Sequence, residues 1–216
     1  PRSTLYYSSE ASDVYKRQAK FPNIRAFTGI NINEPSLTGR FNFSSKGMSA
    51  MFDAPLDGDL ERIFIDPIMD TDNEYRSYKV TPEARQLAQQ RFTKYAPKVM
   101  DVNRLFEPSV RAQKTGQPNT TQDSITYRLA MTATGEYTQY HGGTVADAMA
   151  EIVIMVNRLN DIFEVELGVT LQLVDDNDQL IFTNATTDPF NNDSQDGDLN
   201  QTVTDNRIGT ANYDIG

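Results

Sequence analysis

The apolar pattern between Ile125 and Val174 constrains the fold of this chain more than any other sequence feature. Residues 125–134 are rich in β-branched and apolar side chains and predict a strand. Apolar side chains then recur at helical spacing for five turns, at Val145, Ala148, Met149, Ile152, Val156, Leu159, Ile162 and Phe163. A second strand with alternating apolar residues begins at Val169. A strand, a helix of about 22 residues and a strand form a βαβ unit, whose strands should be parallel with a right-handed crossover.

Both ends of the predicted helix carry local signals. Thr144 stands three residues before Asp147, which is the spacing of a capping-box-like start. Gly168 suits the left-handed conformation that ends many helices. The stretch Tyr140-His141-Gly142-Gly143 is expected to turn the chain between the first strand and this helix.

The first part of the chain predicts an antiparallel meander. Short β-type runs alternate with turn signals, and the candidate strands are residues 24–30, 40–43, 47–52, 62–65 and 75–80. Phe41 and Phe43 alternate with Arg40 and Asn42, which is the period of two expected for a half-buried sheet.

The remaining segments complete the division of the chain. Thr81-Pro82-Glu83 predicts a helix start, with the helix continuing to about Tyr95. The first eighteen residues show no apolar periodicity and are interpreted as an adapter-derived or disordered segment. We therefore divide the chain into residues 1–18, a β-rich unit with a C-terminal helix (19–97), a polar linker (98–124) and a second unit (125–216).

The tail of the second unit is strongly acidic, with nine aspartates and one basic residue, Arg207, from Asp175 onward. Residues 175–178 are expected to form a hairpin turn that leads to a strand at 180–183. Residues 188–205 are interpreted as a polar surface segment, and residues 208–215 as a return to strand.

Composition excludes several classes of function. The chain has no Cys and one His, His141, so a disulfide framework, a cysteine nucleophile and the usual zinc site are excluded. A net charge of −10 argues against a nucleic-acid partner. The longest purely apolar run, residues 152–156, is far short of a membrane span.

No motif assigns a site residue directly. The His-Gly-Gly turn at residues 141–143 is similar to a hydrolase oxyanion loop, but the required Gly-x-Ser-x-Gly elbow and second His are absent. Aligning Gly197 with the glycine of a calcium loop places Val203 where the bidentate Glu belongs, so an EF-hand is excluded and looser Ca²⁺ binding stays open. No residue of this chain is therefore assigned as catalytic, cofactor-binding or metal-ligating.

The second unit resembles a known enzyme family. The strings at residues 127–138, 141–148, 156–163, 183–190 and 208–216 are similar to the opening of the catalytic domain of secreted bacterial reprolysin-like metallopeptidases, which are metzincins. The segment from Gly39 to Pro67 resembles, less specifically, the pro-region of the same family. The expected fold class is α+β / α/β, an N-terminal antiparallel β-rich pro-region followed by the β-α-β start of a twisted mixed sheet.

The resemblance implies a secreted zinc endopeptidase that hydrolyses peptide bonds in protein or peptide substrates with metal-activated water. The family binds Zn²⁺ through a His-Glu-x-x-His-x-x-Gly-x-x-His helix, which this chain does not contain, so the ligands would lie beyond residue 216. The fragment alone is expected to be inactive. The alternative is a non-catalytic extracellular binding or adhesion module that binds calcium through its acidic tail.

Overall fold

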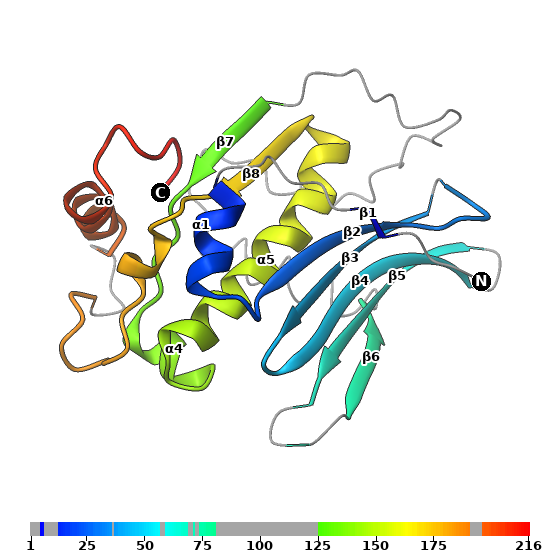
Figure 1. The fold of residues 1–216 in the computed structure, drawn as a ribbon, viewed down its shortest axis with the longest axis horizontal. Coiled ribbons are helices and arrows are strands. Elements are labelled where there is room, and N and C mark those ends of the chain that lie inside the picture. Colours follow the sequence, from blue (N-terminus) through cyan, green and yellow to red (C-terminus); the bar gives the residue numbers. More distant parts are fainter. Residues whose placement is uncertain are drawn as a thin grey trace.

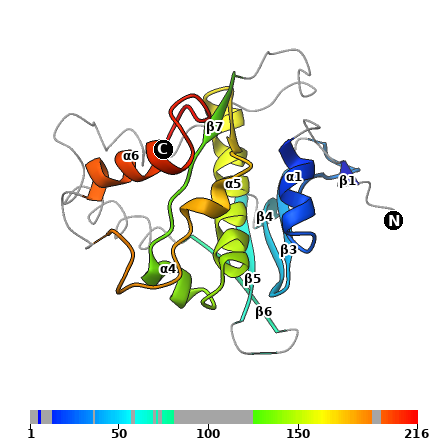
Figure 2. The same ribbon diagram turned by 60° about the vertical axis from the view of Figure 1, so that its left-hand side comes forward.

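The computed structural model describes residues 5–6, 13–35, 37–56, 59–68, 71, 74–80, 125–190 and 196–216. The predicted helix at 81–95 and the linker at 98–124 lie outside these residues. The described residues form a mixed α+β fold with one antiparallel and one parallel sheet. A long central helix, α5 (Val145–Glu166), lies between the two sheets (Figures 1 and 2).

The antiparallel sheet is a six-stranded meander, of which the sequence predicts five strands; the additional first strand lies within residues 1–18, which were interpreted as an adapter-derived or disordered segment. Its strands are β1 (Leu5–Tyr6), β2 (Arg25–Ile30), β3 (Thr38–Ser44), β4 (Gly47–Leu56), β5 (Asp59–Pro67) and β6 (Tyr75–Lys79). Each strand pairs with the next one along the chain. The antiparallel meander is therefore confirmed for the described residues.

The polar face of this sheet is the more buried one. Arg40 is 7% exposed and Asn42 is 2% exposed, whereas Phe43 on the opposite face is 40% exposed. The predicted alternation is thus correct, and the polar side chains face α5. The rings of Phe27 and Phe43 lie 5.7 Å apart on the other face, so the aromatic side chains pack mainly on one another.

The predicted βαβ unit is confirmed. Strand β7 (Ile125–Leu129) pairs in parallel with β8 (Val169–Leu173), and α5 connects them. The Thr144 hydroxyl accepts a hydrogen bond from the Asp147 amide at 3.1 Å at the start of α5. Gly168 has φ +65° directly after the helix, as a left-handed terminator requires.

The main apolar core lies between α5 and the parallel strands. Its buried members are Leu129, Ala133, Ala148, Met149, Ile152, Val153, Val156, Leu171, Leu173 and Ile181. Met149 and Ile152 are almost fully buried, and burial of each such side chain contributes about 1.5–3 kcal/mol. This core holds α5 on β7 and β8, and Ala26 of β2 packs against its edge.

Two asparagine side chains bond to the main chain of β8 and of the segment that follows β7. Asn160 on α5 accepts from the Leu171 amide at 2.8 Å and donates to the Leu171 carbonyl at 2.9 Å. Asn177 makes the same pair of bonds to Met131, at 2.7 and 2.9 Å. In both cases one amide side chain takes the place of a neighbouring strand.

Several expectations for the edges of the second unit are wrong. The first strand ends at Leu129 rather than Thr134, and a short helix α4 (Gly135–Tyr140) follows, because the Thr134 hydroxyl caps it by accepting from the Tyr137 amide. The expected hairpin turn and strand at 175–183 are a 3-10 helix, η1 (Asn177–Leu180), and a single bridge from Ile181 to Ala133. Asn177 bonds to Met131 there and replaces strand pairing.

The acidic tail also differs from the expectation. Residues 196–207, interpreted as part of a surface segment, form α6 (Asp196–Arg207). Its acidic first turn and basic last turn both complement the helix dipole, and Thr204 is fully buried. The strand expected at 208–215 is reduced to one bridge between Ile215 and Leu129.

The first segment, set aside in the sequence analysis, includes a helix, α1 (Asp13–Lys20). Lys20 at its end forms ion pairs with Asp176 at 3.0 Å and Asp178 at 2.8 Å. Phe21 and Ile24 follow and pack against the main core. The chain around α1 therefore contacts the second unit directly.

We predict that Asn177→Ala destabilises the protein by about 2–4 kcal/mol, because two backbone groups of Met131 lose their partner. Chemical denaturation followed by circular dichroism measures this change. Asn206→Ala, at an exposed position of α6, is the matched control and should change stability by no more than about 0.5 kcal/mol. Equal effects of the two substitutions would contradict the assigned role of Asn177.

Candidate functional site

The largest concentration of buried charge in the described residues lies where α5 faces the six-stranded sheet. We call this region the ionic face of α5; its members on the helix are Glu151, Asn157, Arg158, Asp161 and Glu164. They follow one another at intervals that place them on one side of a helix. The other side of α5 carries the apolar core, so the helix has two distinct contact surfaces.

Asp161 is the centre of the ionic face. It is 4% exposed and accepts two arginines from the sheet: Arg40 Nε lies 3.4 Å from Oδ1, and Arg62 Nη2 lies 3.0 Å from Oδ2. A carboxylate removed from water in this way is stable only when it is paired, and loss of one partner of a buried pair typically costs about 3–5 kcal/mol. Buried ion pairs to Asp161 therefore join the sheet to the helix.

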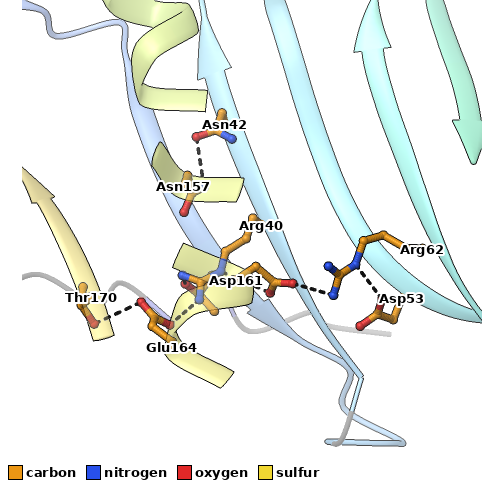
Figure 3. Close-up of polar contacts among 9 residues, drawn as sticks. Arg40, Asn42, Asp53, Arg62, Asn157, Asp161, Glu164 and Thr170 are labelled. Atoms are coloured by element: carbon orange, nitrogen blue, oxygen red, sulfur yellow. Dashed lines mark hydrogen bonds and ion pairs between the residues drawn. The ribbon is translucent and has the colours of Figure 1, made fainter. Parts of the chain in front are cut away.

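Each arginine has a second partner. Arg40 also pairs with Glu164 of α5 and donates to the Thr28 hydroxyl at 2.8 Å. Arg62 donates from Nε to the Asp53 carboxylate at 3.2 Å, within the sheet. Both guanidinium groups are thereby oriented before they reach α5, as the close-up shows (Figure 3).

Two further contacts cross between the sheet and α5 farther along the helix. The Asn157 amide donates to the Asn42 side-chain oxygen at 3.0 Å. Arg158 pairs with Asp66 of β5 at 2.6 Å and lies over the Phe64 ring at 5.3 Å. The contact thus runs along several turns of α5 and is polar for most of its length.

The last contact lies near the start of α5. Lys46, in the turn between β3 and β4, donates to Glu151 at 3.1 Å and to the backbone carbonyl of His141. His141 Nδ1 lies 3.7 Å from the same glutamate. Burial lowers the pKa of His141 below its ordinary value of 6.5; the Glu151 charge opposes this shift and the Lys46 charge adds to it.

A cavity of about 310 Å³ remains between the sheet and α5. Its lining mixes apolar and charged side chains: Met51, Arg62, Phe64, Tyr137, Glu151, Ile154, Met155, Arg158, Leu159 and Ile162. Burial, with a smaller contribution from the Glu151 charge, raises the pKa of Tyr137 to about 12. The pocket opens to solvent beside this contact, whereas the core on the other side of α5 is closed.

The structure places His141 where the sequence predicts a turn. It caps the C-terminal end of α4, and Gly142 and Gly143 follow with φ of +119° and +86°. Of the calcium-loop positions, Asp196 lies in the first turn of α6, and Val203 packs against a small core instead of facing a loop. Within the described residues, no group of three or more His, Asp or Glu side chains is placed to hold a metal ion.

Sequence reasoning missed the ionic face. It treated the long helix by its apolar residues alone and assigned no role to Glu151, Arg158, Asp161 or Glu164. Their spacing along one side of a helix was a readable signal. It did not reveal that the partners would be Arg40 and Lys46, which are more than a hundred residues away.

We predict that the His141 pKa lies below 6.5 and falls further in Glu151→Gln, because the charge that favours the imidazolium is removed. Lys46→Met should raise it. Since His141 is the single histidine, its ring proton signals can be followed by NMR from about pH 4 to about pH 8 without assignment ambiguity.

The stability consequence has a defined sign. A lowered folded-state pKa means that the contribution of neutral His141 is complete above pH 6.5 and is lost as pH falls through the folded-state pKa. A His141 titration midpoint at or above 6.5 would contradict the arrangement described. Arg25→Glu, at an exposed position on β2, should leave the midpoint unchanged.

Among the described residues, no helix is both long enough and apolar enough to cross a membrane. The comparison with curated proteins gave no match, and the comparison with solved structures gave none. Residues 123–216 match a family model described as metallo-peptidase family M12B, reprolysin-like. That range holds β7, α5, β8 and α6. The second part of this chain is therefore similar to the reprolysin-like M12B metallopeptidases.

Proposed function

We propose that this chain is part of a secreted zinc-dependent endopeptidase. In this proposal residues 125–216 form the N-terminal half of the catalytic domain, and residues 19–97 are its pro-region. The six-stranded sheet would then be the folded part of the pro-region, and the substrate would be a protein or peptide. The polypeptide as given is expected to be inactive.

The observation that carries the proposal is the family match over residues 123–216, together with the strand–helix–strand order inside it. The family match begins at residue 123 and the apolar strand–helix–strand pattern at residue 125, so the two agree on where this unit begins. The β7–α5–β8 unit is a scaffold whose apolar core does not depend on a metal. Its proposed role is to support the substrate-binding and metal-binding elements of the domain.

The described residues do not fit a zinc site. His141 faces Glu151, which also pairs with Lys46, and within the described part of the chain no cluster of metal-ligating side chains surrounds them. A catalytic zinc site takes three protein ligands, with His prominent among them. We therefore assign no catalytic step to these residues and place the zinc ligands in sequence that follows residue 216.

The test uses the gene product extended beyond residue 216. We expect the extended protein to contain one zinc ion per chain by elemental analysis and to cleave an unstructured protein substrate. A chelator should abolish the cleavage, and replacing the glutamate of its His-Glu-x-x-His motif by glutamine should do so without loss of zinc. An extended sequence that lacks a histidine-bearing helix, or a product without stoichiometric zinc, would contradict the proposal.

A calcium-binding adhesion module is the second candidate, favoured by the nine aspartates that follow residue 174. This candidate predicts that millimolar calcium raises the melting temperature of the 216-residue chain by several degrees. The metallopeptidase proposal predicts no shift for this chain. Magnesium at the same concentration is the control for general charge screening, and Asp196→Asn is the control for a contribution from the α6 terminus.

A further inference from the structure

We propose that Asn184 is an acceptor site for N-linked glycosylation, with an oligosaccharide attached to its side-chain nitrogen. Residues 184–186 are Asn-Ala-Thr, which has the Asn-x-Thr form of such acceptors. The inference rests on the secretion proposed above, because acceptors of this kind are modified on the surface loops of secreted proteins. It adds a covalent modification that the peptidase proposal does not require.

The triplet alone does not distinguish this site from others in the chain. Asn-x-Ser/Thr triplets begin at five positions, which are Asn42, Asn119, Asn184, Asn192 and Asn200. Two of them, Asn119 and Asn192, lie outside the residues that the structure describes. The structure therefore allows a comparison of Asn184 with Asn42 and Asn200.

The fold blocks both of these other triplets. Asn42 is 2% exposed, and its side-chain oxygen accepts a hydrogen bond from the Asn157 amide at 3.0 Å beneath α5, so an oligosaccharide has no space there. Asn200 is half-buried within α6, and its side-chain oxygen is shielded from solvent. The hydroxyl of its triplet, on Thr202, donates to the Asp198 carbonyl at 3.1 Å and so bonds away from the asparagine.

Asn184 has a different geometry. It is exposed, and its Oδ1 accepts hydrogen bonds from the Thr186 amide at 2.9 Å and from the Thr186 hydroxyl at 2.5 Å. A backbone amide can only donate, so the side-chain atom that faces it is the oxygen and the nitrogen points to the other side. Within the described residues, Nδ2 of Asn184 has no hydrogen-bond partner. The atom that would carry the sugar is thus free, while the Thr of the triplet orients the side chain.

The inner side of this turn is fixed to α4. The Asn184 carbonyl accepts from the Thr187 and Asp188 amides at 3.2 and 3.0 Å, and the Asp188 carboxylate accepts from the Gly135 amide at 2.6 Å. A Cβ added at Gly135 would lie 2.1 Å from the Ala185 nitrogen, so the turn packs directly on the first residue of the helix. The backbone is held from within, and the side chain of Asn184 extends from a rigid support.

The outer side of the turn is suited to a bulky polar group. Residues 183–187 contain no charged side chain, although the tail around them is strongly acidic. Thr183, Thr186 and Thr187 are exposed beside Asn184. In Figures 1 and 2 this orange turn lies beside α4, on the side of the molecule away from the six-stranded sheet. An oligosaccharide at this position would therefore extend into solvent and leave the contact between α5 and the sheet intact.

The transfer requires an oligosaccharide linked to a polyprenyl pyrophosphate as the donor. Nδ2 of Asn184 forms a bond to C1 of the first sugar, and the bond from C1 to the pyrophosphate oxygen breaks. The pyrophosphate leaves with the bonding electron pair, and Nδ2 loses one proton. No atom is oxidised or reduced, so the step needs no further reactant.

The test exposes the folded 216-residue chain to an oligosaccharyltransferase and this donor, and maps the products by glycopeptide mass spectrometry. We expect a glycan on Asn184 and none on Asn42 or Asn200. A proteolytic digest of the same chain, in which the fold no longer shields Asn42 and Asn200, is the positive control for the enzyme. A folded chain without a glycan on Asn184, or with equal modification of Asn42 or Asn200, would overturn the proposal.

Substitutions within the turn test the role of the triplet. Asn184→Gln and Thr186→Ala should each abolish the modification, because the first removes the acceptor and the second removes the hydroxyl that bonds to it. Thr187→Ala is the matched control, an exposed threonine of the same turn that lies outside the triplet, and should keep the glycan. Circular dichroism verifies that each variant folds. Equal occupancy in Thr186→Ala and Thr187→Ala would contradict the assignment.

This experiment measures neither zinc nor peptide-bond cleavage. Its failure would leave the metallopeptidase proposal standing, and a chain without zinc after extension would leave the glycan result unchanged. The two proposals are therefore tested separately.

Discussion

The paired carboxylate of Asp161 and the apolar stripe on the opposite side of the same helix together determine how this molecule is assembled. The stripe joins α5 to the parallel strands and makes the second unit a compact body. Asp161 then accepts Arg40 and Arg62 from a different sheet, with very little of it exposed to solvent. Helix α5 therefore packs against the parallel strands through an apolar surface and against the six-stranded sheet through a charged surface.

This division explains the orientation of the six-stranded sheet. A sheet with Phe27, Phe41 and Phe43 on one face would ordinarily turn them inward, because burial of aromatic area is favourable. Here the facing side of α5 carries the carboxylates of Asp161 and Glu164, and the opposing face of the sheet carries guanidinium groups. Burying these charges is favourable only when they are paired, so the sheet packs with Arg40 inward.

Local sequence signals predicted the regular elements well. The helix from Val145 to Glu166 followed from apolar spacing, Thr144 and Gly168, which are all encoded within a few residues of one another. The meander followed from turn residues between short β-type runs. The irregular part from Asp175 onward was predicted poorly, because Asn177 bonds to Met131, a partner 46 residues away that no local pattern reveals.

The candidate site was the least predictable feature, for the same reason. From the sequence alone, Glu151 and Asp161 are expected to be solvent-exposed charges on a helix. Only the structure shows that the six-stranded sheet lies against them. Their partners, Lys46 and Arg40, lie on strands or turns whose own pattern shows only alternation. Pairing between such distant charges is a property of the tertiary arrangement, and a single sequence does not encode it in any spacing.

Asn160 on α5 binds the middle of β8 and thereby limits the side on which another strand can join the small parallel sheet. Asn160 satisfies both main-chain groups of Leu171, so the middle of that border is closed to an incoming strand. On the far border, Ile215 already bridges to Leu129 in parallel. Additional strands of this sheet would consequently be recruited beyond β7, past Ile215, and the helix that crosses over the sheet also acts as its boundary.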